Sequence, residues 1–277
     1  MELNVEHLRQ WIGREETASE LVTSGLVQRF NATLDRQGDT RTGAVAPLML
    51  HYCLASDAQA TAALGQDGHP ARGGFLPPVP LPRRMWAGGA LEFREDLRIG
   101  QIMTRRSVIR DVVAKSGRSG ALCFVTLEHE ITGDGRSVLT ERQDIVYRAP
   151  EEPKSAATHA TSPAGTHRRT VIPSATLLFR YSALTFNSHR IHYDAPYARD
   201  VEHYPGLVVH GPLQASLLVQ FAQEIGARCP TRFSFRSLSP LFDDAAFVVS
   251  AAEEAGALRL WTAREHGPVA MEARAEW

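Results

Sequence analysis

The sequence predicts an α+β protein made of two similar halves, each with one helix and a set of antiparallel strands. Each half contains one segment with apolar residues at helical spacing and several segments that alternate apolar and polar residues. The Gly-bearing turns SGRSG and GDG separate strands of the first half, as is typical of antiparallel hairpins. Periodicity therefore indicates layers of helix and antiparallel sheet, built twice along the chain.

Composition limits the class of protein. The chain has 277 residues, enough for one large domain or two smaller ones, and its 30 Lys and Arg against 31 Asp and Glu give a net charge of -1. This balance argues against nucleic-acid binding, although it allows a local cationic pocket. The 3 cysteines include no CxxC pair, as expected for a reduced cytosolic protein. A charged N-terminal segment and the lack of an apolar run of about 20 residues predict a cytoplasmic chain without membrane contact.

A change of composition marks the boundary between the halves. Residues 151–169, EEPKSAATHATSPAGTHRR, are rich in Ala, Ser, Thr and Pro and have almost no large apolar side chains. Such a segment buries too little surface to fold alone. We therefore expect an N-terminal unit over 1–150, a linker over 151–170 and a C-terminal unit over 171–277.

In the first half, a capping box predicts where the helix begins. Thr17–Glu20 reads T-A-S-E, and Val22, Leu26, Phe30 and Leu34 follow at spacings of four along one helical stripe. Alternation then predicts strands over 90–100, 101–117, 120–135 and 137–150.

The second half begins with a predicted strand, TLLFRYSALTF, over 176–186. Residues 212–228 follow as a helix with Leu213, Leu217, Phe221 and Ile225 on one stripe and further apolar residues around it. A helix that is apolar on most sides is buried. The segments 231–241, 245–256, 257–267 and 268–277 alternate as antiparallel strands with tight turns.

Polar residues are unusually dense just before this buried helix. Asn187, His189, Arg190, His192 and Asp194 fall within eight positions, and VVHG then leads directly into the helix, which places Gly211 at or near its N-terminus. The first backbone N–H groups of a helix lack intrahelical partners and favour an oxyanion. A glycine there lets a carbonyl approach without meeting a Cβ, which is what an oxyanion hole requires.

These residues resemble the MaoC-like hydratase and dehydratase family. Tyr181-Ser182, Ile191-His192 and His210-Gly211 match its Tyr-Ser, Ile-His and helix-entry His-Gly. The chain departs from the family where Phe186-Asn187 replaces Gly-Asp and His189-Arg190 replaces Asn-Pro. The segment LTFNSHRIHYD, together with FLPPVPLPRRMWAGG and GRSGALCFVTLEHE, resembles the branch of double hot-dog hydratases that act on itaconyl-CoA, mesaconyl-CoA or methylfumaryl-CoA.

The resemblance covers nearly the whole chain beyond its first dozen residues, and it implies an architecture. We expect a double hot-dog, in which two antiparallel sheets each wrap around a long central helix. The active site would lie at the seam, with the second half catalytic and the first half, which lacks the motif, kept as a wall of the pocket. A homodimer is expected as well.

The implied activity is hydration or dehydration of a short 2-enoyl-type CoA thioester, in the manner of a hydro-lyase. His192 is the candidate base, because imidazole titrates near neutral pH. The Gly211 N–H would hold the thioester oxygen, while Asn187 can only offer hydrogen bonds. The proton for the α-carbon then comes either from His192 itself or with help from Asp194 or another acid.

Further residues are candidates for supporting roles. His210 and Tyr181 stand beside the motif. Contacts to the acyl end or to CoA phosphates are expected from five residues: Arg83, Arg84, Trp86, Arg180 and Arg190.

Alternative interpretations remain for each feature. Taken alone, His192 would be an ordinary hydrogen-bonded histidine, Asn187 a turn cap and Gly211 a helix N-cap. His189-x-x-His192, with Asp194, His203 and His210 nearby, resembles a metal site but has no third ligand at a diagnostic spacing, so we expect no metal. No cofactor is expected, because nucleotide-binding fingerprints are missing from the sequence. Other functions to test are a hot-dog thioesterase and a non-catalytic acyl-CoA binding protein.

Overall fold

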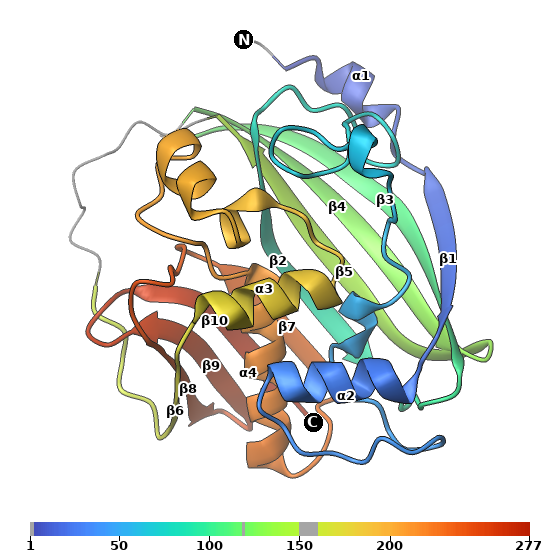
Figure 1. The fold of residues 1–277 in the computed structure, drawn as a ribbon, viewed down its shortest axis with the longest axis vertical. Coiled ribbons are helices and arrows are strands. Elements are labelled where there is room, and N and C mark those ends of the chain that lie inside the picture. The colour runs from blue at the N-terminus through green and yellow to red at the C-terminus, as the bar shows by residue number, and fades with distance from the viewer. Residues whose placement is uncertain (1–2, 118–119, 150–159) are drawn as a thin grey trace.

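The computed structural model describes residues 3–117, 120–149 and 160–277, and its strands form a single antiparallel sheet (Figure 1). The sheet has 10 strands in the order β1-β3-β4-β5-β2-β7-β10-β9-β8-β6. The strands of the first half are β1 (Glu15–Leu21), β2 (Arg83–Phe93), β3 (Ile102–Gly117), β4 (Gly120–Gly133) and β5 (Arg136–Arg148). Those of the second half are β6 (His167–Val171), β7 (Arg232–Ser237), β8 (Phe247–Glu254), β9 (Ala257–Arg264) and β10 (Val269–Glu276).

The two halves join where β2 pairs antiparallel with β7, from Gly88↔Arg236 to Glu92↔Arg232. Glycine is needed at this junction: a Cβ on Gly88 would lie 2.6 Å from the Phe235 carbonyl oxygen, and one on Gly89 would lie 2.7 Å from that of Arg142. The antiparallel architecture is thus as predicted, but the strands make one continuous sheet rather than two. Pairing satisfies the backbone groups that β2 and β7 would each expose at an edge.

The long helix α4 (Gly211–Gly226) packs across the strands of the second half, as predicted. Its side chains Leu213, Leu218 and Val219 are fully buried. The helix of the first half, α2 (Ser24–Thr33), packs against α3 (Ala175–Leu184) in front of the sheet (Figure 1). The expectation of one long central helix in each half is therefore confirmed only for the second.

The predicted start of α2 is wrong, although the helix itself is present. Thr17–Glu20 lies in β1, and the helix is capped by Thr23, whose hydroxyl accepts a hydrogen bond from the Leu26 N–H at 3.1 Å. Both segments carry an N-cap residue type, and pairing of β1 with β3 decides between them.

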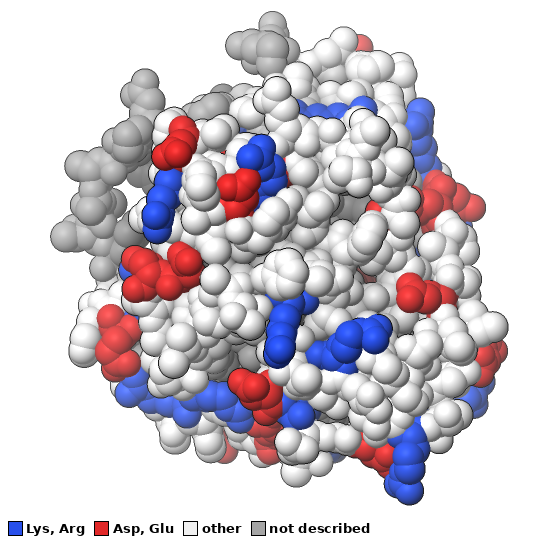
Figure 2. Space-filling view, in the orientation of Figure 1, with Lys and Arg blue, Asp and Glu red and all other residues white. Residues whose placement is uncertain are grey.

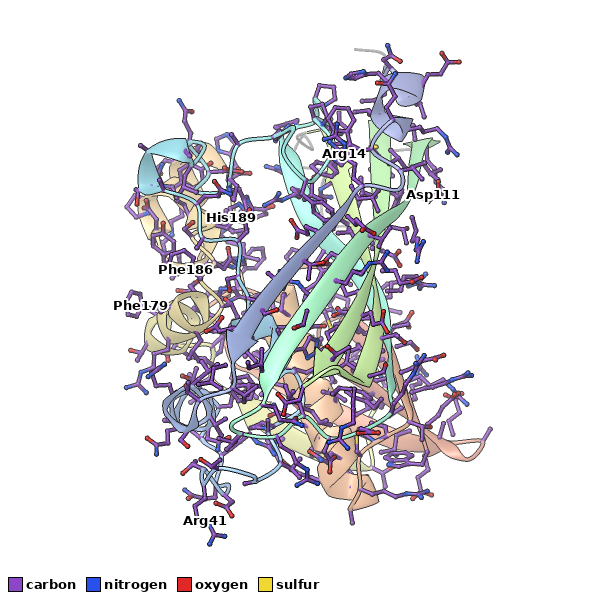
Figure 3. The ribbon with its side chains drawn as sticks, turned by 90° about the vertical axis from the view of Figure 1, so that its right-hand side faces the viewer. Arg14, Arg41, Asp111, Phe179, Phe186 and His189 are labelled. Atoms are coloured by element: carbon purple, nitrogen blue, oxygen red, sulfur yellow. The ribbon has the colours of Figure 1, made fainter. Side chains whose placement is uncertain are left out.

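The predicted strand over 176–186 is also wrong, because this segment forms the helix α3 (Ala175–Leu184). Ser174 caps it by accepting a hydrogen bond from the Leu177 N–H at 3.2 Å. The buried residues Leu178, Tyr181 and Ser182 follow the i, i+3, i+4 spacing of a helix face, whereas Phe179 is 62% exposed. Figure 3 shows Phe179 on the outer side of this layer, away from the sheet.

The remaining strand predictions are confirmed within a few residues, except that the segment 90–100 contributes only the end of β2. Strand β6 and the helix α1 (Val5–Arg9) were not predicted. Part of the SGRSG turn, at 118–119, and the linker residues 150–159 lie outside the described residues.

The cysteines are buried or half-buried, and charged side chains lie on the surface. Cys53 and Cys123 are buried free thiols, and Cys229 is half-buried. Figure 2 shows charges of both signs scattered over one face, with uncharged surface between them. Among the described residues, no helix is long and apolar enough to cross a bilayer.

Candidate active site at the start of helix α4

His192 is held in a defined orientation by the backbone beside it. It ends a short 3-10 turn, Arg190–His192, and its Nδ1 lies 2.7 Å from the carbonyl oxygen of Val208. A carbonyl can only accept, so the proton sits on Nδ1 and the lone pair sits on Nε2. The Val208 N–H in turn donates to the Ile191 carbonyl at 2.9 Å, which fixes the two segments together. The ring is therefore set up to accept a proton at Nε2.

The ring of His192 stacks on that of His210, with centroids 3.7 Å apart and planes 18° apart. His210 is the N-cap residue of α4, so His192 lies directly beside the start of the buried helix. The Nε2 of His210 lies 2.8 Å from the Ser182 hydroxyl on α3, while its buried Nδ1 has no partner within the described chain. Tyr181 packs its ring 5.1 Å from that of His210.

Gly211 opens α4 and leaves its amide available. The described residues give its N–H no backbone acceptor, and the next residue, Pro212, has no N–H at all. A Cβ on Gly211 would lie 3.8 Å from Trp86 and 3.9 Å from Met271, which is ordinary van der Waals contact. Packing therefore tolerates a side chain here, so the protein interior alone does not require glycine. The indole N–H of Trp86, buried beside it, also has no partner in the described part of the chain.

Burial sets the protonation of these histidines. Desolvation lowers the pKa of His192 to about 4, although its hydrogen bond to Val208 opposes the shift and the charge of His69 adds to it. Burial, and then the charges of His192 and His189, hold the pKa of His210 well below its usual range. Both rings are therefore neutral near pH 7, the form in which an imidazole accepts a proton.

Asn187 forms a turn rather than a contact with His192. Its side-chain oxygen accepts a hydrogen bond from the His189 N–H at 3.0 Å. The residue before it, Phe186, has a φ of 50° and is 61% exposed. Figure 3 shows His189 closer to the sheet than Phe186. This geometry is that of a turn cap, and it leaves the amide NH₂ of Asn187 as the group able to reach a ligand.

Asp194 is engaged away from His192. Its carboxylate binds the Arg190 guanidinium at 2.7 and 2.9 Å and accepts the Tyr197 N–H at 3.1 Å. The guanidinium of Arg190 also stacks over the Tyr197 ring at 4.1 Å. These contacts make Asp194 and Arg190 a structural pair of the loop.

The other predicted arginines separate into two kinds. Arg83 is bound to Glu202 at 3.2 Å, and Arg180 is exposed on α3. Arg84, on β2 opposite Tyr147, is near enough for its positive charge to contribute to lowering the pKa of His69 and His189. Among the predicted arginines, Arg84 is the one whose charge acts on the protonation of His69 and His189.

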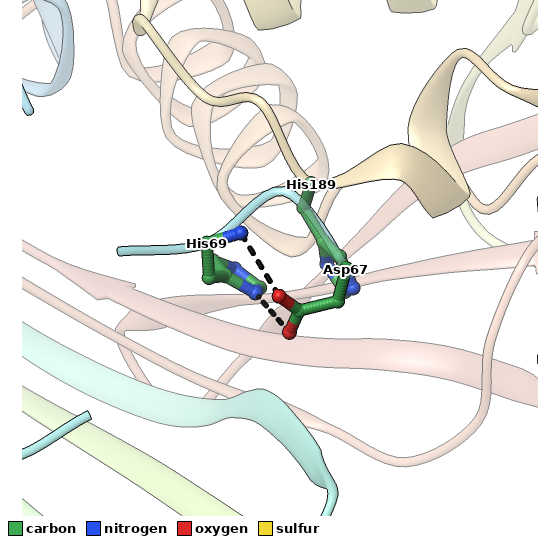
Figure 4. A group of neighbouring side chains, drawn as sticks. All are labelled: Asp67, His69 and His189. Atoms are coloured by element: carbon green, nitrogen blue, oxygen red, sulfur yellow. Dashed lines mark hydrogen bonds and ion pairs between the residues drawn. The ribbon is translucent and has the colours of Figure 1, made fainter. Parts of the chain in front are cut away.

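The structure adds a carboxylate and a further histidine that sequence reasoning missed. Asp67 and His69 come from the first half, in the loop G-Q-D-G-H-P over 65–70, and reach the motif of the second half (Figure 4). The Asp67 carboxylate accepts hydrogen bonds from the His69 N–H and from Nδ1 of its ring, both at 3.0 Å. The His69 ring lies 4.0 Å from that of His189, whose ring is 5.4 Å from that of His192. The sequence feature that could have indicated these residues is the polar segment Asp67-Gly68-His69, whose glycine is typical of a turn.

Asp67, His69 and His189 are also close enough together to hold a metal ion, since their ligand atoms lie within 4.8 Å of one another. Both carboxylate oxygens are, however, already bonded to His69. The positive charges of Arg84 and Arg72 also act on His69. A dication would be repelled by these guanidinium groups, so the chemistry of the cluster favours acid–base work over metal binding.

Comparison with known proteins identifies the family of the chain. Residues 49–243 match the family model described as hydroxyacyl-thioester dehydratase type 2. The chain is 44% identical over 269 residues to the mesaconyl-C(4)-CoA hydratase of Chloroflexus aurantiacus, covering 96% of each. It is 27% identical over 218 residues to the mitochondrial hydroxyacyl-thioester dehydratase type 2 of Schizosaccharomyces pombe, covering 69% of this chain and 73% of that one.

Solved structures agree on the fold. A MaoC-like dehydratase from Phytophthora capsici superposes with a TM-score of 0.71 at 14% identity, covering 99% of this chain and 97% of that one. A Mycobacterium tuberculosis protein described as a double hot-dog fold superposes at 0.61 and 14% identity, covering 95% of each chain. The chain therefore belongs to the hydroxyacyl-thioester dehydratase type 2 family of MaoC-like, hot-dog hydro-lyases.

Proposed function

We propose that this chain reversibly hydrates a short, branched, unsaturated dicarboxylyl-CoA thioester, such as mesaconyl-CoA or itaconyl-CoA. The observation that carries the proposal is the buried, neutral His192, whose Nδ1 is bonded to the Val208 carbonyl and whose ring stacks on His210, the N-cap residue just before Gly211. The 44% identity to a mesaconyl-C(4)-CoA hydratase over nearly the full length favours the dicarboxylic acyl class.

The reaction follows from these two groups. His192 Nε2 takes a proton from water as the water oxygen bonds to the β-carbon. The π electrons of the double bond then move onto the thioester oxygen, where the Gly211 N–H stabilises the charge. The imidazolium returns its proton to the α-carbon, which restores the neutral ring and the carbonyl. Because Asn187 cannot titrate and Asp194 is bound to Arg190, His192 is the group that transfers both protons. Water is then added to one face of the substrate.

Arg84 provides a basis for acyl selection. A dicarboxylyl thioester carries a carboxylate near its β-carbon, and burying that charge requires a cation. The Arg84 guanidinium is hydrogen-bonded to Tyr147, pairs with no carboxylate in the described residues, and its charge reaches His69 and His189, so we assign it to the substrate carboxylate. Arg83 and Arg190 are already paired with Glu202 and Asp194.

The division of labour between the halves is part of the proposal. The unit over 171–277 supplies His192 and Gly211, and the unit over 1–150 lines the pocket through Trp86 and Arg84 on β2. This gives one site per chain. The expected homodimer stays a prediction, which light scattering at several protein concentrations tests.

The decisive experiment is a panel of crotonyl-, itaconyl-, mesaconyl- and long-chain enoyl-CoA esters, followed by loss of the enone absorbance and by product mass. We expect water addition, with preference for the dicarboxylic esters. Preference for crotonyl or long chains would overturn the proposed acyl class.

Two other readouts test the competing functions. Release of free thiol, measured in the same wells, would identify a thioesterase. Tight binding without any change in the enone, in both the wild type and His192→Ala, would identify an acyl-CoA binding protein.

A further inference from the structure

We infer that Asp67 and His69 of the first half complete the acid–base site of the second half, by placing a carboxylate-bound imidazole behind His189 and His192. The inference rests on the proposed hydration at His192 and extends it to residues outside the helix-entry motif. In it, Asp67 and His69 are positioning residues: they act through the neighbouring rings rather than on the substrate.

Contacts form a continuous path from Asp67 to the start of α4. Asp67 binds His69 at 3.0 Å, and the rings of His69, His189, His192 and His210 follow at centroid separations of 4.0, 5.4 and 3.7 Å. The three motif histidines are less than a tenth exposed. Four imidazoles with one carboxylate at the far end form an array in which charge on one ring is felt by the next.

The loop that carries Asp67 is docked on the motif rather than merely near it. The Arg190 N–H donates to the Asp67 carbonyl at 2.9 Å, and the Arg190 guanidinium donates to the Gln66 carbonyl at 3.0 Å. The Ser188 hydroxyl donates to the Gly68 carbonyl. Gly68 has a φ of +86°, and a Cβ there would collide with the Ser188 carbonyl. The loop therefore fits this partner only with glycine at position 68.

The proposed reaction requires a negative charge near the histidine rings. When His192 takes a proton from water, a positive charge appears on a buried ring, and such a charge needs compensation. Position 187 offers only a carboxamide, and Asp194 is neutralised by Arg190. Asp67 is the carboxylate that faces these rings. Burial alone would raise its pKa, but the hydrogen bonds and charge of His69 hold it well below the usual range, so it is ionised at working pH.

Charged groups around the four histidine rings have opposite effects on the protonation of those rings. Arg84 and Arg72 act on His69 and disfavour its protonated form, while Asp67 favours it. A proton on His189 is disfavoured by Arg84 and by any proton on His69 or His192, and it is favoured by the Asp67 carboxylate. Removing the Asp67 charge therefore leaves Arg84 and Arg72 uncompensated beside His69, and we infer that this makes a proton on His192 more costly through the rings between them.

The test is Asp67→Asn in the full-length protein, assayed on the best ester of the panel. Asparagine still accepts the turn hydrogen bond from the His69 N–H, so the loop keeps its shape while it loses its charge. We expect kcat to fall at least about tenfold with KM and thermal stability little changed, because the variant weakens part of the about 10² to 10⁴ that general acid–base catalysis by His192 contributes. The acid limb of kcat/KM should move to lower pH, since the pKa of His192 falls.

A second variant restores a carboxylate beside the same rings. In Asp67→Asn/Asn187→Asp the new carboxylate sits next to His189, and we expect it to recover much of kcat. Asp39→Asn is the matched control, because Asp39 accepts the Arg41 N–H at 3.0 Å in the same two-residue turn but faces no histidine. It should behave as the wild type.

The outcomes separate this inference from the proposed function. Wild-type kcat and an unmoved acid limb in Asp67→Asn, alongside an inactive His192→Asn, would overturn the inference and leave the hydration mechanism intact. Full activity in His192→Asn would remove the mechanism on which both depend. A loss of kcat in Asp67→Asn that Asn187→Asp fails to recover, with lowered thermal stability, would assign Asp67 a structural role only.

Discussion

Replacing His192 by asparagine separates its chemical role from its effect on folding. The Nδ2 of asparagine occupies the place of the imidazole Nδ1, so it can keep the hydrogen bond to the Val208 carbonyl. The variant loses the Nε2 lone pair and the titration of the ring. We expect kcat to fall by about 10² to 10⁴, the range that general acid–base catalysis supplies.

The same substitution changes the pH dependence of stability by an amount that the pKa of His192 fixes. Burial lowers that pKa from 6.5 to about 4 in the folded protein. Between these values the unfolded chain binds more protons, so stability is retained above about pH 6.5 and is lost as the pH falls toward 4. The lost stability is about 3 kcal/mol over the whole window, and about 2 kcal/mol of it falls between pH 7 and 5.

The assay is urea unfolding at pH 7 and pH 5, beside enone kinetics at pH 7. His192→Asn should lose about 2 kcal/mol less than the wild type between the two pH values. His129→Gln is the matched control, because His129 is also buried with a lowered pKa but lies on β4 between Ser107 and Gln143. It should flatten the same pH dependence and keep its activity. An unchanged pH dependence in His192→Asn, or kcat within threefold of the wild type, would refute the assignment of a buried neutral base.

Three further predictions test other parts of the site. Gly211→Ala should keep its thermal stability, because a Cβ there meets only Trp86 and Met271 at 3.8 to 3.9 Å, but kcat should fall about 10²-fold as the methyl group displaces the thioester oxygen. Equal losses of stability and activity would instead mean that packing requires the glycine. Arg84→Gln should raise KM for the dicarboxylic esters and leave crotonyl-CoA unaffected; a uniform change in KM across the panel would contradict its role in selection. Gly68→Ala should lower Tm by several degrees, since it adds about 1 kcal/mol or more of backbone strain and a clash with Ser188, and calorimetry measures this.

Local signals in the sequence were sufficient for the helix that carries the site. Apolar residues on most sides of the segment 212–228 predicted a buried helix, and the position of His210-Gly211 just before it predicted where the helix begins. Periods of 2 and 3.6 residues report burial within one element, and the strands β3 to β5 were found in the same way. The motif also predicted that His192 and Gly211 share one site; the structure stacks His192 on His210, the residue before Gly211.

Where local signals competed, only tertiary contacts decided the outcome. The segment 176–186 is apolar enough for either a strand or a helix, and packing of Leu178 and Tyr181 beside the N-cap Ser174 made it α3. Thr17 and Thr23 are both acceptable caps, and pairing of β1 with β3 selected Thr23. In each case the choice was settled by a partner element outside the local window.

The sequence motif alone predicted an imidazole near the N-terminus of a buried helix, because His192 and the first residues of that helix belong to one segment of the chain. Tertiary structure decided which carboxylate reaches the histidine cluster around that imidazole. Ser188 and Gly68 meet across 120 positions of the chain, and no local pattern records such a contact. Docking of the 65–70 loop brings Asp67 and His69 to the motif, while Asp194, close in sequence to His192, is drawn away by Arg190. A carboxylate that is close to a histidine in the sequence is therefore not always close to its ring in the folded protein, because folding pairs groups according to burial and hydrogen bonding.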